Sequence, residues 1–402
     1  MSAPWDLAVV GAGPAGSAAA LGALRARPGA RVLLLDRSEF PRDKSCGDGV
    51  APHALDELAR LGVPDLLADR VPVRRLRLVG PAGQEVATTL RRPDVVVPRT
   101  VLDARLVQAA VAAGATLVQH QVRDLEVRDG LVVLDGRLRA RAVVGADGAN
   151  GVVRRLLARR TSAAHRQPDG ALAVAVRGYA PAPPGEPEQL IVMDDRGWPA
   201  YAWSFGAGDG TANVGFGMLL PRLREAQARQ GRSGREVLHG RLRELLPGVE
   251  AERLVSHHLP LSTSRPASPP GPVVLAGDAL SLINPLTGEG IYYALASGRL
   301  AGEAAVSAAD PGTAYAAALR RELGRHLRHT TLLARLTERS GVVDAGIAAA
   351  GRSPRAFDAL VELGLGRGLI TAPLVAGMAR EVGGRVVRGA RRRSAAARRA
   401  RT

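Results

Sequence analysis

Gly11-Ala12-Gly13-Pro14-Ala15-Gly16 is the stretch that decides the fold of this 402-residue chain. It follows directly on a short apolar run, Leu7–Val10, and opens an alanine-rich stretch that predicts a helix to about Arg27. A second apolar run over residues 31–35 predicts the next strand, which ends at Asp36, 20 residues after Gly16. Strand, glycine turn, helix and strand in this order predict the βαβ opening of a dinucleotide-binding domain.

Each glycine of this turn has its own steric role. Gly11 permits the tight turn, Gly13 lets the backbone approach a pyrophosphate, and Gly16 lets the helix pack closely on the strand. The helix N-terminus supplies unpaired N–H groups and the positive end of a dipole for the phosphates. The carboxylate of Asp36 can accept hydrogen bonds from an adenosine ribose. A glycine turn with a purely structural role is the alternative, but strand, helix and acidic residue agree with a dinucleotide.

Two later segments indicate which dinucleotide binds. Gly145-Ala146-Asp147-Gly148 ends one predicted strand, and Gly277-Asp278 ends another over residues 272–276. Residues 284–290, Asn-Pro-Leu-Thr-Gly-Glu-Gly, follow soon after. Each segment alone is an ordinary strand-ending turn, but in this order they resemble the FAD-binding pattern of the flavoprotein hydroxylase superfamily. The resemblance implies that Asp278 binds the ribityl chain. It also implies that residues 284–290 approach the isoalloxazine ring, where a helix N-terminus would stabilise the anion of reduced flavin.

Further motifs point to one branch of that superfamily. Residues 44–50, Lys-Ser-Cys-Gly-Asp-Gly-Val, resemble the K-x-C-G-x-G loop of the geranylgeranyl reductase family, which in that family lies near the flavin and the substrate. Residues 99–106 are similar to its R-x-x-[FL]-D-x-x-L segment, and residues 284–299 to its flavin loop. Residues 198–205 are similar to its Y-x-W-x-F motif, which lines the substrate cavity. The resemblance covers roughly residues 5–310.

The resemblance implies one set of residues around FAD and a smaller set around the substrate. The chain has no second glycine fingerprint for a nicotinamide, so NAD(P)H is expected as an electron donor that binds without such a motif. The FAD set is Gly11, Gly13, Pro14, Ala15, Gly16, Asp36, Arg37, Lys44, Cys46, Gly47, Arg99, Arg105, Asp147, Gly277, Asp278, Pro285, Gly288, Glu289, Gly290 and Ile291. The substrate set is Asp48, Gly49, Tyr201, Trp203 and Phe205, with Cys46 as the catalytic candidate.

The implied reaction is the reduction of isolated C=C bonds in isoprenoid chains, such as geranylgeranyl groups of lipids, chlorophyll precursors or menaquinone. A hydride from reduced flavin must meet one alkene carbon and a proton the other, so the proton donor must be close and the site dry. Cys46 is a candidate to position or protonate the substrate, because a thiol with a pKa of about 8.5 is mostly protonated at neutral pH. The alternative is that Cys46 is a small buried packing residue.

The aromatic residues of the 198–205 motif alternate with smaller ones. Strand alternation places Tyr201, Trp203 and Phe205 on one face, where they would form an apolar wall for a prenyl chain. Ordinary core packing is the alternative explanation. Typical members of the family continue this motif with Pro-Lys, whereas Gly206 and Ala207 stand here. This departure leaves the substrate class open.

Two other functions therefore compete with the reductase. A flavin monooxygenase or oxidase that acts on a secondary metabolite would share nearly all the flavin residues, although the loop at residues 44–50 favours the reductase. A halogenase is disfavoured because the sequence has no W-x-W-x-I-P motif. The second competing function is a non-enzymatic flavin-binding module, such as a membrane-associated scaffold.

These patterns predict an α/β fold with a Rossmann-like FAD-binding domain of the glutathione-reductase type. An antiparallel β-sheet substrate domain is inserted in it, and a helical region follows. The FAD-binding domain is expected to be discontinuous, with residues 1–73, 99–165 and 263–310. The substrate domain is expected to comprise a hairpin at residues 74–98 and a mostly sheet segment at 166–262. Helices are predicted for residues 311–384, and residues 385–402 are predicted to be a disordered basic tail.

Composition excludes several classes of protein. Hydrophobic residues make up 46% and charged residues 23%, so the chain can bury a large core and is neither disordered nor fibrous. No uncharged apolar run reaches 18 residues and no signal peptide is evident, so the expected compartment is the cytoplasm. Cys46 is the single cysteine, which excludes a disulfide scaffold. No metal site is expected, because no carboxylate or cysteine completes a ligand set around histidines such as His326 and His329.

The net charge of +17 does not indicate nucleic-acid binding. Lys44 is the only lysine among 55 basic residues, and eight of the arginines lie between Arg385 and Arg401. The remaining excess is spread along the chain without interleaved aromatic residues, and no nucleic-acid-binding module is recognisable. The basic tail and the apolar stretch Gly368–Ala379 predict weak peripheral association with an anionic membrane face, where lipid substrates reside.

Overall fold

The first of two sheets begins with the predicted βαβ unit. The computed structural model describes residues 3–160, 168–265 and 269–381. The strand order in this sheet is β6-β2-β1-β9-β8-β7, and β15 also pairs with β9. The pairs β6–β2, β2–β1, β1–β9 and β9–β15 are parallel, whereas β9–β8 and β8–β7 are antiparallel. The strands are β1 (Trp5–Val10), β2 (Val32–Asp36), β6 (Thr116–Gln119), β7 (Leu125–Arg128), β8 (Leu131–Leu134), β9 (Leu138–Gly145) and β15 (Val273–Leu275).

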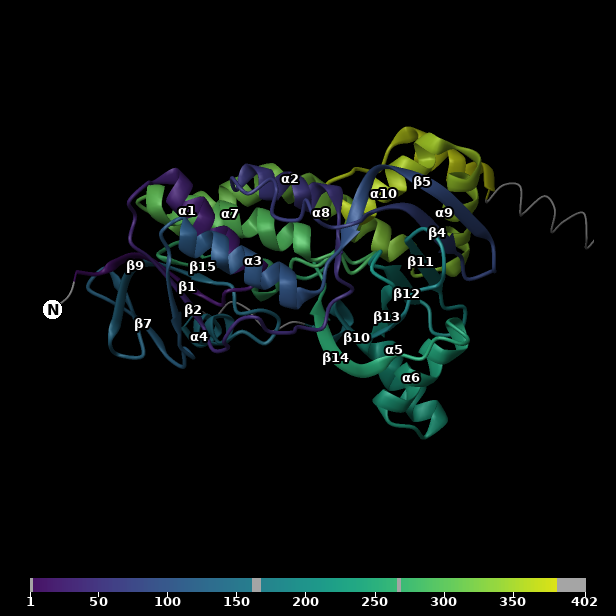
Figure 1. Cartoon of the computed structure of the whole chain (residues 1–402), viewed down its shortest axis with the longest axis horizontal. Helices are drawn as coiled ribbons and strands as arrows, with labels where there is room; N and C mark the ends of the chain where they lie inside the picture. The colour runs from purple at the N-terminus through teal and green to yellow at the C-terminus, as the bar shows by residue number, and fades with distance from the viewer. Residues whose placement is uncertain (1–2, 161–167, 266–268, 382–402) are drawn as a thin grey trace, which may run out of the picture.

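Helices α1 (Pro14–Ala26) and α7 (Ile291–Ser307) lie side by side against this sheet, as Figure 1 shows. Small residues allow their backbones to approach closely. A Cβ atom at Gly298 would overlap the carbonyl oxygen of Ala15, and one at Gly302 would overlap that of Ala19. This packing fixes the N-terminus of α1, which the glycine turn precedes, against α7. Helix α3 (Arg99–Ala112) packs beside α1.

The second sheet has the strand order β14-β10-β13-β12-β11-β4-β5-β3. It is mixed rather than antiparallel as predicted, because β4 and β11 pair in parallel while the other pairs are antiparallel. Strand β3 follows directly on the Cys46 loop and pairs with β5, so that loop is tied to the second sheet. The strands are β3 (Gly49–Val50), β4 (Pro72–Val79), β5 (Glu85–Val96), β10 (Leu172–Pro181), β11 (Glu188–Met193), β12 (Ala200–Gly206), β13 (Thr211–Leu219) and β14 (Glu252–Pro260).

The segment predicted to be mostly sheet, residues 166–262, also contains two helices. These are α5 (Leu220–Gln230) and α6 (Gly234–Leu245), and their buried apolar side chains pack on strands β10 and β13. Ser233 and Glu236 form a capping box at the start of α6, a signal that is present in the sequence. Strands still form most of the regular structure of this segment, as predicted, but the two helices were not expected.

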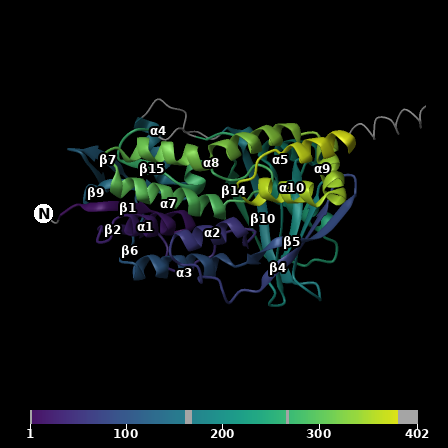
Figure 2. The same cartoon turned by 90° about the horizontal axis from the view of Figure 1, so that it is seen from above.

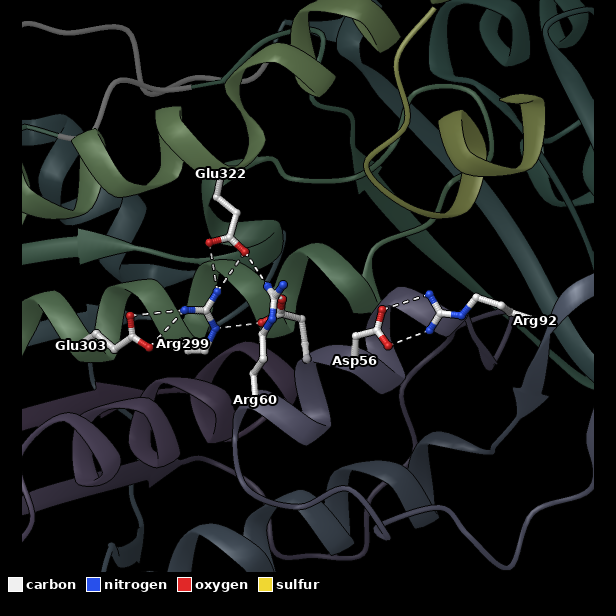
Figure 3. A network of polar contacts seen from close by, with 7 residues as sticks. Asp56, Arg60, Arg92, Arg299, Glu303 and Glu322 are labelled. Carbon is white, nitrogen blue, oxygen red and sulfur yellow. Dashed lines mark hydrogen bonds and ion pairs between the residues drawn. The ribbon is translucent and has the colours of Figure 1, made fainter. Parts of the chain in front are cut away.

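An ion-pair network connects α2 (Pro52–Arg60) to α7 and α8, and Figure 3 shows it from close by. The carboxylate of Glu57, which is 1% exposed, forms ion pairs with Arg60 at 2.6 Å and with Arg299 of α7 at 2.8 Å. Glu322 on α8 (Pro311–Leu336) pairs with the same two arginines, at 2.8 and 3.0 Å. Because α2 begins soon after the Cys46 loop, this network holds one end of that loop against the helical layer.

The last helices pack against the second sheet, as Figures 1 and 2 show. Leu76 and Leu90 of the β4–β5 hairpin share an apolar cluster with Ala350 and Phe357. These two residues belong to α9 (Ser340–Arg352) and α10 (Pro354–Leu365), and one more helix covers residues 372–381. The predicted tail, residues 385–402, lies outside the described residues. The chain therefore has an α/β fold with two mixed sheets. The short elements α4 (Val152–Arg160), η1 (Asp169–Ala171) and η2 (Gly277–Leu280) complete it.

Candidate active site

A cavity of about 540 Å³ extends from the glycine turn to the C-terminal helices. Pro14, the 44–49 loop and residues 285–291 line one end of it. The middle is lined by strands of the second sheet, and the far end by residues of α8, α9 and α10. The cavity therefore joins the predicted cofactor position to an apolar compartment.

The glycine turn has the geometry that a pyrophosphate requires. Gly11 has a φ of 98°, and a Cβ there would lie 2.5 Å from the carbonyl oxygen of Ala146. No side chain caps the N-terminus of α1, so its first N–H groups are open to a ligand. A Cβ at Gly13 would lie 3.4 Å from the guanidinium of Arg42 and 3.8 Å from that of Arg99. These features fit the phosphates of a dinucleotide.

Two arginines lie beside the glycine turn, and both form ion pairs with the same aspartate. Arg99 donates two hydrogen bonds to Asp103, at 2.7 and 2.8 Å, and Arg42 pairs with the same carboxylate at 3.1 Å. Burial opposes the charge of Arg99, but Asp103 more than compensates and raises the pKa of Arg99. Asp36 accepts hydrogen bonds from the N–H groups of Ala12 (2.8 Å) and Ser38 (2.9 Å). Sequence reasoning missed Arg42, which lies in an irregular loop without a recognisable motif.

Lys44 and Asp278 pair at 3.0 Å where the cavity meets η2. Burial would raise the pKa of Asp278, but the charge of Lys44 holds it below its usual range. His257 also lines this part of the cavity, and burial together with Lys44 lowers its pKa to about 4. His257 is therefore neutral at physiological pH.

The Cys46 loop is held from behind by buried polar side chains of the second sheet. The Asn213 amide donates to the Cys46 carbonyl and to the Asp48 carboxylate, both at 2.8 Å. The Tyr179 hydroxyl also donates to Asp48, at 2.5 Å. Burial raises the pKa of Asp48 to about 6 despite these bonds, and it raises the pKa of the Cys46 thiol. The thiol therefore stays protonated at neutral pH, in a loop whose position the sheet fixes.

The three aromatic residues of β12 line the cavity in a row. The ring centroids of Tyr201 and Trp203 lie 6.0 Å apart, and those of Trp203 and Phe205 lie 6.4 Å apart. The Tyr201 hydroxyl donates to the carbonyl of Thr287, which ties the row to the 284–290 loop. The indole N–H of Trp203 donates to the side-chain oxygen of Asn213 at 2.9 Å. Asn213 therefore contacts both the aromatic row and the Cys46 loop.

The 284–290 loop is fixed by a segment that carried no motif in the sequence. The side-chain amide of Asn284 donates to the carbonyls of Leu363 (2.8 Å) and Gly364 (3.1 Å), and the Thr287 hydroxyl donates to the latter at 2.6 Å. Asn284 also donates to the hydroxyl of Tyr293 at 3.0 Å. The C-terminal helices thus set the position of the loop as well as the far wall of the cavity.

Two carboxyl groups on opposite elements also line the cavity. Asp94 of β5 is 2% exposed, and burial together with the charge of Glu289 raises its pKa to about 7. Burial raises the pKa of Glu289 to about 7 as well, against hydrogen bonds from the N–H groups of Ile291 and Tyr292. Sequence reasoning did not single out Asp94, because it stands in a hairpin strand of mixed polar and apolar residues.

Most of the predicted residues line the cavity, but nine do not. Gly11, Gly13, Ala15, Gly16 and Asp36 belong to the glycine turn, the start of α1 and the end of β2, and four more have other partners. Residues that line the cavity are Pro14, Lys44, Cys46, Gly47, Asp48, Gly49, Arg99, Tyr201, Trp203, Phe205, Asp278, Pro285, Gly288, Glu289, Gly290 and Ile291. Arg105 instead pairs with Asp69 at 2.6 Å, and Arg37 is exposed beyond β2. Asp147 accepts a hydrogen bond from the N–H of Val153 in α4 (3.0 Å), and Gly277 lies against α1 and α7.

Comparisons with known proteins agree with this geometry. Residues 5–193 match the FAD binding domain family. A menaquinone reductase of Mycolicibacterium smegmatis is 37% identical over 75% of this chain and 76% of the relative. Digeranylgeranylglycerophospholipid reductase 1 of Methanopyrus kandleri is 34% identical, over 79% and 84%.

Solved structures share the fold at lower sequence identity. A geranylgeranyl bacteriochlorophyll reductase-like protein from Thermoplasma acidophilum aligns with a TM-score of 0.74 and 19% identity, over 94% of this chain and 96% of that one. A flavin-dependent brominase aligns with a TM-score of 0.66 and 18% identity, over 95% of this chain and all of that one. Within residues 3–160, 168–265 and 269–381, no helix has both the length and the apolar character to cross a bilayer.

Proposed function

This chain belongs to the geranylgeranyl reductase family of FAD-dependent oxidoreductases, and from that premise we propose that it reduces C=C bonds of an isoprenoid or similar apolar chain. The cavity is the observation that carries the proposal. It runs from the Cys46 loop along an aromatic row to an apolar end between the C-terminal helices. The names of the relatives, menaquinone reductase and digeranylgeranylglycerophospholipid reductase, support a substrate with a long apolar chain.

FAD is the cofactor that the residues fit. The phosphates would lie at the N-terminus of α1 beside Arg42 and Arg99, and the ribityl chain near Asp278. We assign residues 1–73, 99–165 and 263–310 to a glutathione-reductase-type FAD-binding domain, and residues 74–98 and 166–262 to an inserted substrate domain. We further propose NAD(P)H as the electron donor.

The residues of this chain bind and orient the substrate and exclude water. When bound and reduced, FAD supplies a hydride. The aromatic row of Tyr201, Trp203 and Phe205 holds the apolar chain, and Cys46 orients the double bond from a loop that Asn213 and Asp48 keep in place. The apolar wall keeps water from the reacting carbons, which prevents loss of reducing equivalents to side reactions.

The test follows the two half-reactions separately. Denaturation of the pure protein should release about one FAD per chain, as a tightly and non-covalently bound cofactor requires. Without oxygen, the protein is reduced by NAD(P)H or dithionite and mixed with menaquinone or a geranylgeranyl lipid in detergent. Reoxidation of the flavin with gain of two hydrogen atoms by the isoprenoid chain is the expected result. A colourless protein that takes up no FAD, or reduced flavin that no isoprenoid reoxidises, contradicts the proposal.

A cavity-filling variant links this chemistry to the apolar compartment. Ile191→Trp should block the chain-binding wall, slow reoxidation by substrate and leave reduction by the donor unchanged. Val127→Trp, at an exposed site on β7, is the matched control.

A monooxygenase or oxidase is the second candidate function, because Gly206 and Ala207 replace the Pro-Lys that is typical of the reductases. The same experiment in the presence of oxygen separates the two. Oxygen consumption that rises with substrate, together with a hydroxylated product, would favour the monooxygenase.

A further inference from the structure

Asp94 and Glu289 approach the cavity from different parts of the fold and differ in what surrounds them. Asp94 lies on β5, two residues before Val96, which pairs with Gly49 next to the Cys46 loop. Glu289 belongs to the 284–290 loop directly before α7. Both line the same cavity as Cys46.

Asp94 has the surroundings of a carboxylic acid that keeps its proton. It is 2% exposed, and the Gln189 side chain is hydrogen-bonded to it. Its Oδ1 atom has no hydrogen-bond partner among the residues that the structure describes. A buried carboxylate with an unpaired oxygen is costly, whereas a buried neutral acid is not. The burial and the charge of Glu289 both favour the protonated form, which the raised pKa of about 7 reflects.

Glu289 has the surroundings of a carboxylate. It accepts hydrogen bonds from the N–H groups of Ile291 and Tyr292, at 2.8 Å from Tyr292, at the N-terminus of α7. Helix N-termini stabilise negative charge. Asp94 and Glu289 line one cavity and repel each other when both are ionised, so the pair favours holding one proton, and the helix N-terminus favours the charge on Glu289.

The other charged and titratable groups near Asp94 and Glu289 have partners of their own and do not change which of the two carries the proton. Arg92 of β5 forms an ion pair with Asp56 at 2.6 Å, and His53 of α2 pairs with Glu362 at 3.2 Å. The Tyr201 hydroxyl already donates to Thr287, and burial raises the pKa of Tyr201 beyond the physiological range. Burial likewise raises the pKa of the Cys46 thiol, which makes it a weaker acid than a carboxyl group of pKa about 7.

We propose that Asp94 is the proton donor to the substrate alkene and that the carboxylate of Glu289 keeps it protonated and stabilises positive charge that develops on the substrate. This inference rests on the proposed reductase function. The Asp94 O–H bond breaks, and its proton forms a C–H bond with the π electrons of the alkene. A hydride, which FAD would supply when bound and reduced, would form the second C–H bond at the other carbon, so the two electrons that the alkene gains would come from the flavin. Asp94 is left as a carboxylate and regains a proton from solvent before the next turnover.

The kinetic test compares Asp94→Asn with Asp65→Asn, an exposed aspartate far from the cavity as the control. Asparagine has nearly the shape of the protonated acid, so FAD content and reduction by the donor should match the wild type. Reoxidation by substrate should slow by about 10²-fold or more, a typical share for general acid catalysis. In the wild type this rate should fall as pH rises through about 7, because only the protonated acid donates, and Asp94→Asn should lack this dependence.

Two further variants sharpen the assignment. Asp94→Glu retains an acid and should recover part of the lost rate. Glu289→Gln removes the charge that holds the proton on Asp94, so the fall in rate should move to lower pH. A rate of Asp94→Asn within threefold of the wild type, with an unchanged pH profile, overturns the proposal.

Infrared spectroscopy tests the proton location without turnover. At pH 6 the wild-type spectrum minus that of Asp94→Asn should contain a protonated-carboxyl band from Asp94, beside the contributions that Asp48 and other buried acids make to both spectra, and Glu289→Gln should retain this band. A band that disappears in Glu289→Gln instead would place the proton on Glu289 and overturn the assignment. If no isoprenoid reoxidises the wild-type flavin, the reductase function fails and the donor role fails with it. The band still shows which carboxyl group holds the proton, so the two failures remain distinguishable.

Discussion

Cys46 and Asp94 face the same cavity but differ in how readily each releases a proton. The Cys46 side chain is partly buried, and burial raises the pKa of its thiol, which makes it a weaker acid. The carboxyl group has its pKa raised to about 7, which is close to the operating pH where general acids are most effective. Cys46, which belongs to the sequence motif, is therefore suited to positioning the substrate. The proposed acid, Asp94, lies on a strand that carries no motif.

Replacement of Cys46 by alanine should slow reoxidation of reduced flavin by substrate by about 10²-fold, because a misplaced double bond reacts poorly. FAD binding and reduction by the donor should remain near normal, and Cys46→Ser should fall between alanine and the wild type. The fall in rate above about pH 7 should persist in both variants. Stopped-flow absorbance of the flavin across this pH range measures all three quantities. A substrate half-reaction within threefold of the wild type would make Cys46 a packing residue.

At the scale of elements, contacts between helices set the site. Helix α7 packs directly on α1 through glycines and so fixes the N-terminus of α1, where the phosphates of FAD would lie in the proposed function. A side chain at Gly298 would meet the backbone of Ala15, which cannot move without moving the glycine turn. The stability of this helix pair and the affinity for FAD are therefore coupled.

Gly298→Ala should lower the free energy of unfolding by about 1–3 kcal/mol, the usual range for overpacking of a close contact, and should weaken FAD binding as well. Gly240→Ala in α6 is the matched control, because a Cβ there meets nothing within 4 Å. That control should stabilise the protein by about 0.5–1 kcal/mol through helix propensity and leave FAD binding unchanged. Chemical denaturation and FAD titration of both variants provide the measurement. Equal FAD affinity in a destabilised Gly298→Ala protein would separate the two effects and contradict the coupling.

The pairing of Glu57 with two arginines gives a second prediction at this scale (Figure 3). Glu57→Gln should cost about 1.5–3 kcal/mol, because Arg299, which is 11% exposed, keeps Glu303 and Glu322 but loses its charge-assisted hydrogen bond to a fully buried partner. Its neighbour Asp56 pairs with Arg92 at the surface, each side chain being 48% exposed, so Asp56→Asn should cost about 0–1 kcal/mol. Thermal unfolding compares the two. Equal losses would show that burial of the Glu57 network adds nothing to its strength.

At the scale of the whole molecule, sequence reasoning succeeded where structure follows from local pattern. The βαβ opening, the β4–β5 hairpin and the C-terminal helices are confirmed, because each has its own periodicity or turn signal. The parallel pairing of β4 with β11 was not predictable, since it joins strands about 110 residues apart. Arg42, Asp94 and Asn213 were missed for the same reason: each acquires its role from a partner distant in sequence.

The cavity ends between helices that are followed by the basic tail, and this arrangement leads to a prediction about the whole molecule. Residues 385–402 contain eight arginines and no acidic residue, and each arginine near an anionic bilayer contributes about 1 kcal/mol of attraction. The full chain should therefore sediment with anionic liposomes at low salt. It should release at high salt, because screening shortens the reach of the charges. It should not bind vesicles of neutral lipid. Removal of residues 385–402 should abolish most of the binding while leaving FAD content and donor reduction intact. Equal binding of the full and shortened chains at low salt would show that the tail does not carry the attraction to the anionic bilayer.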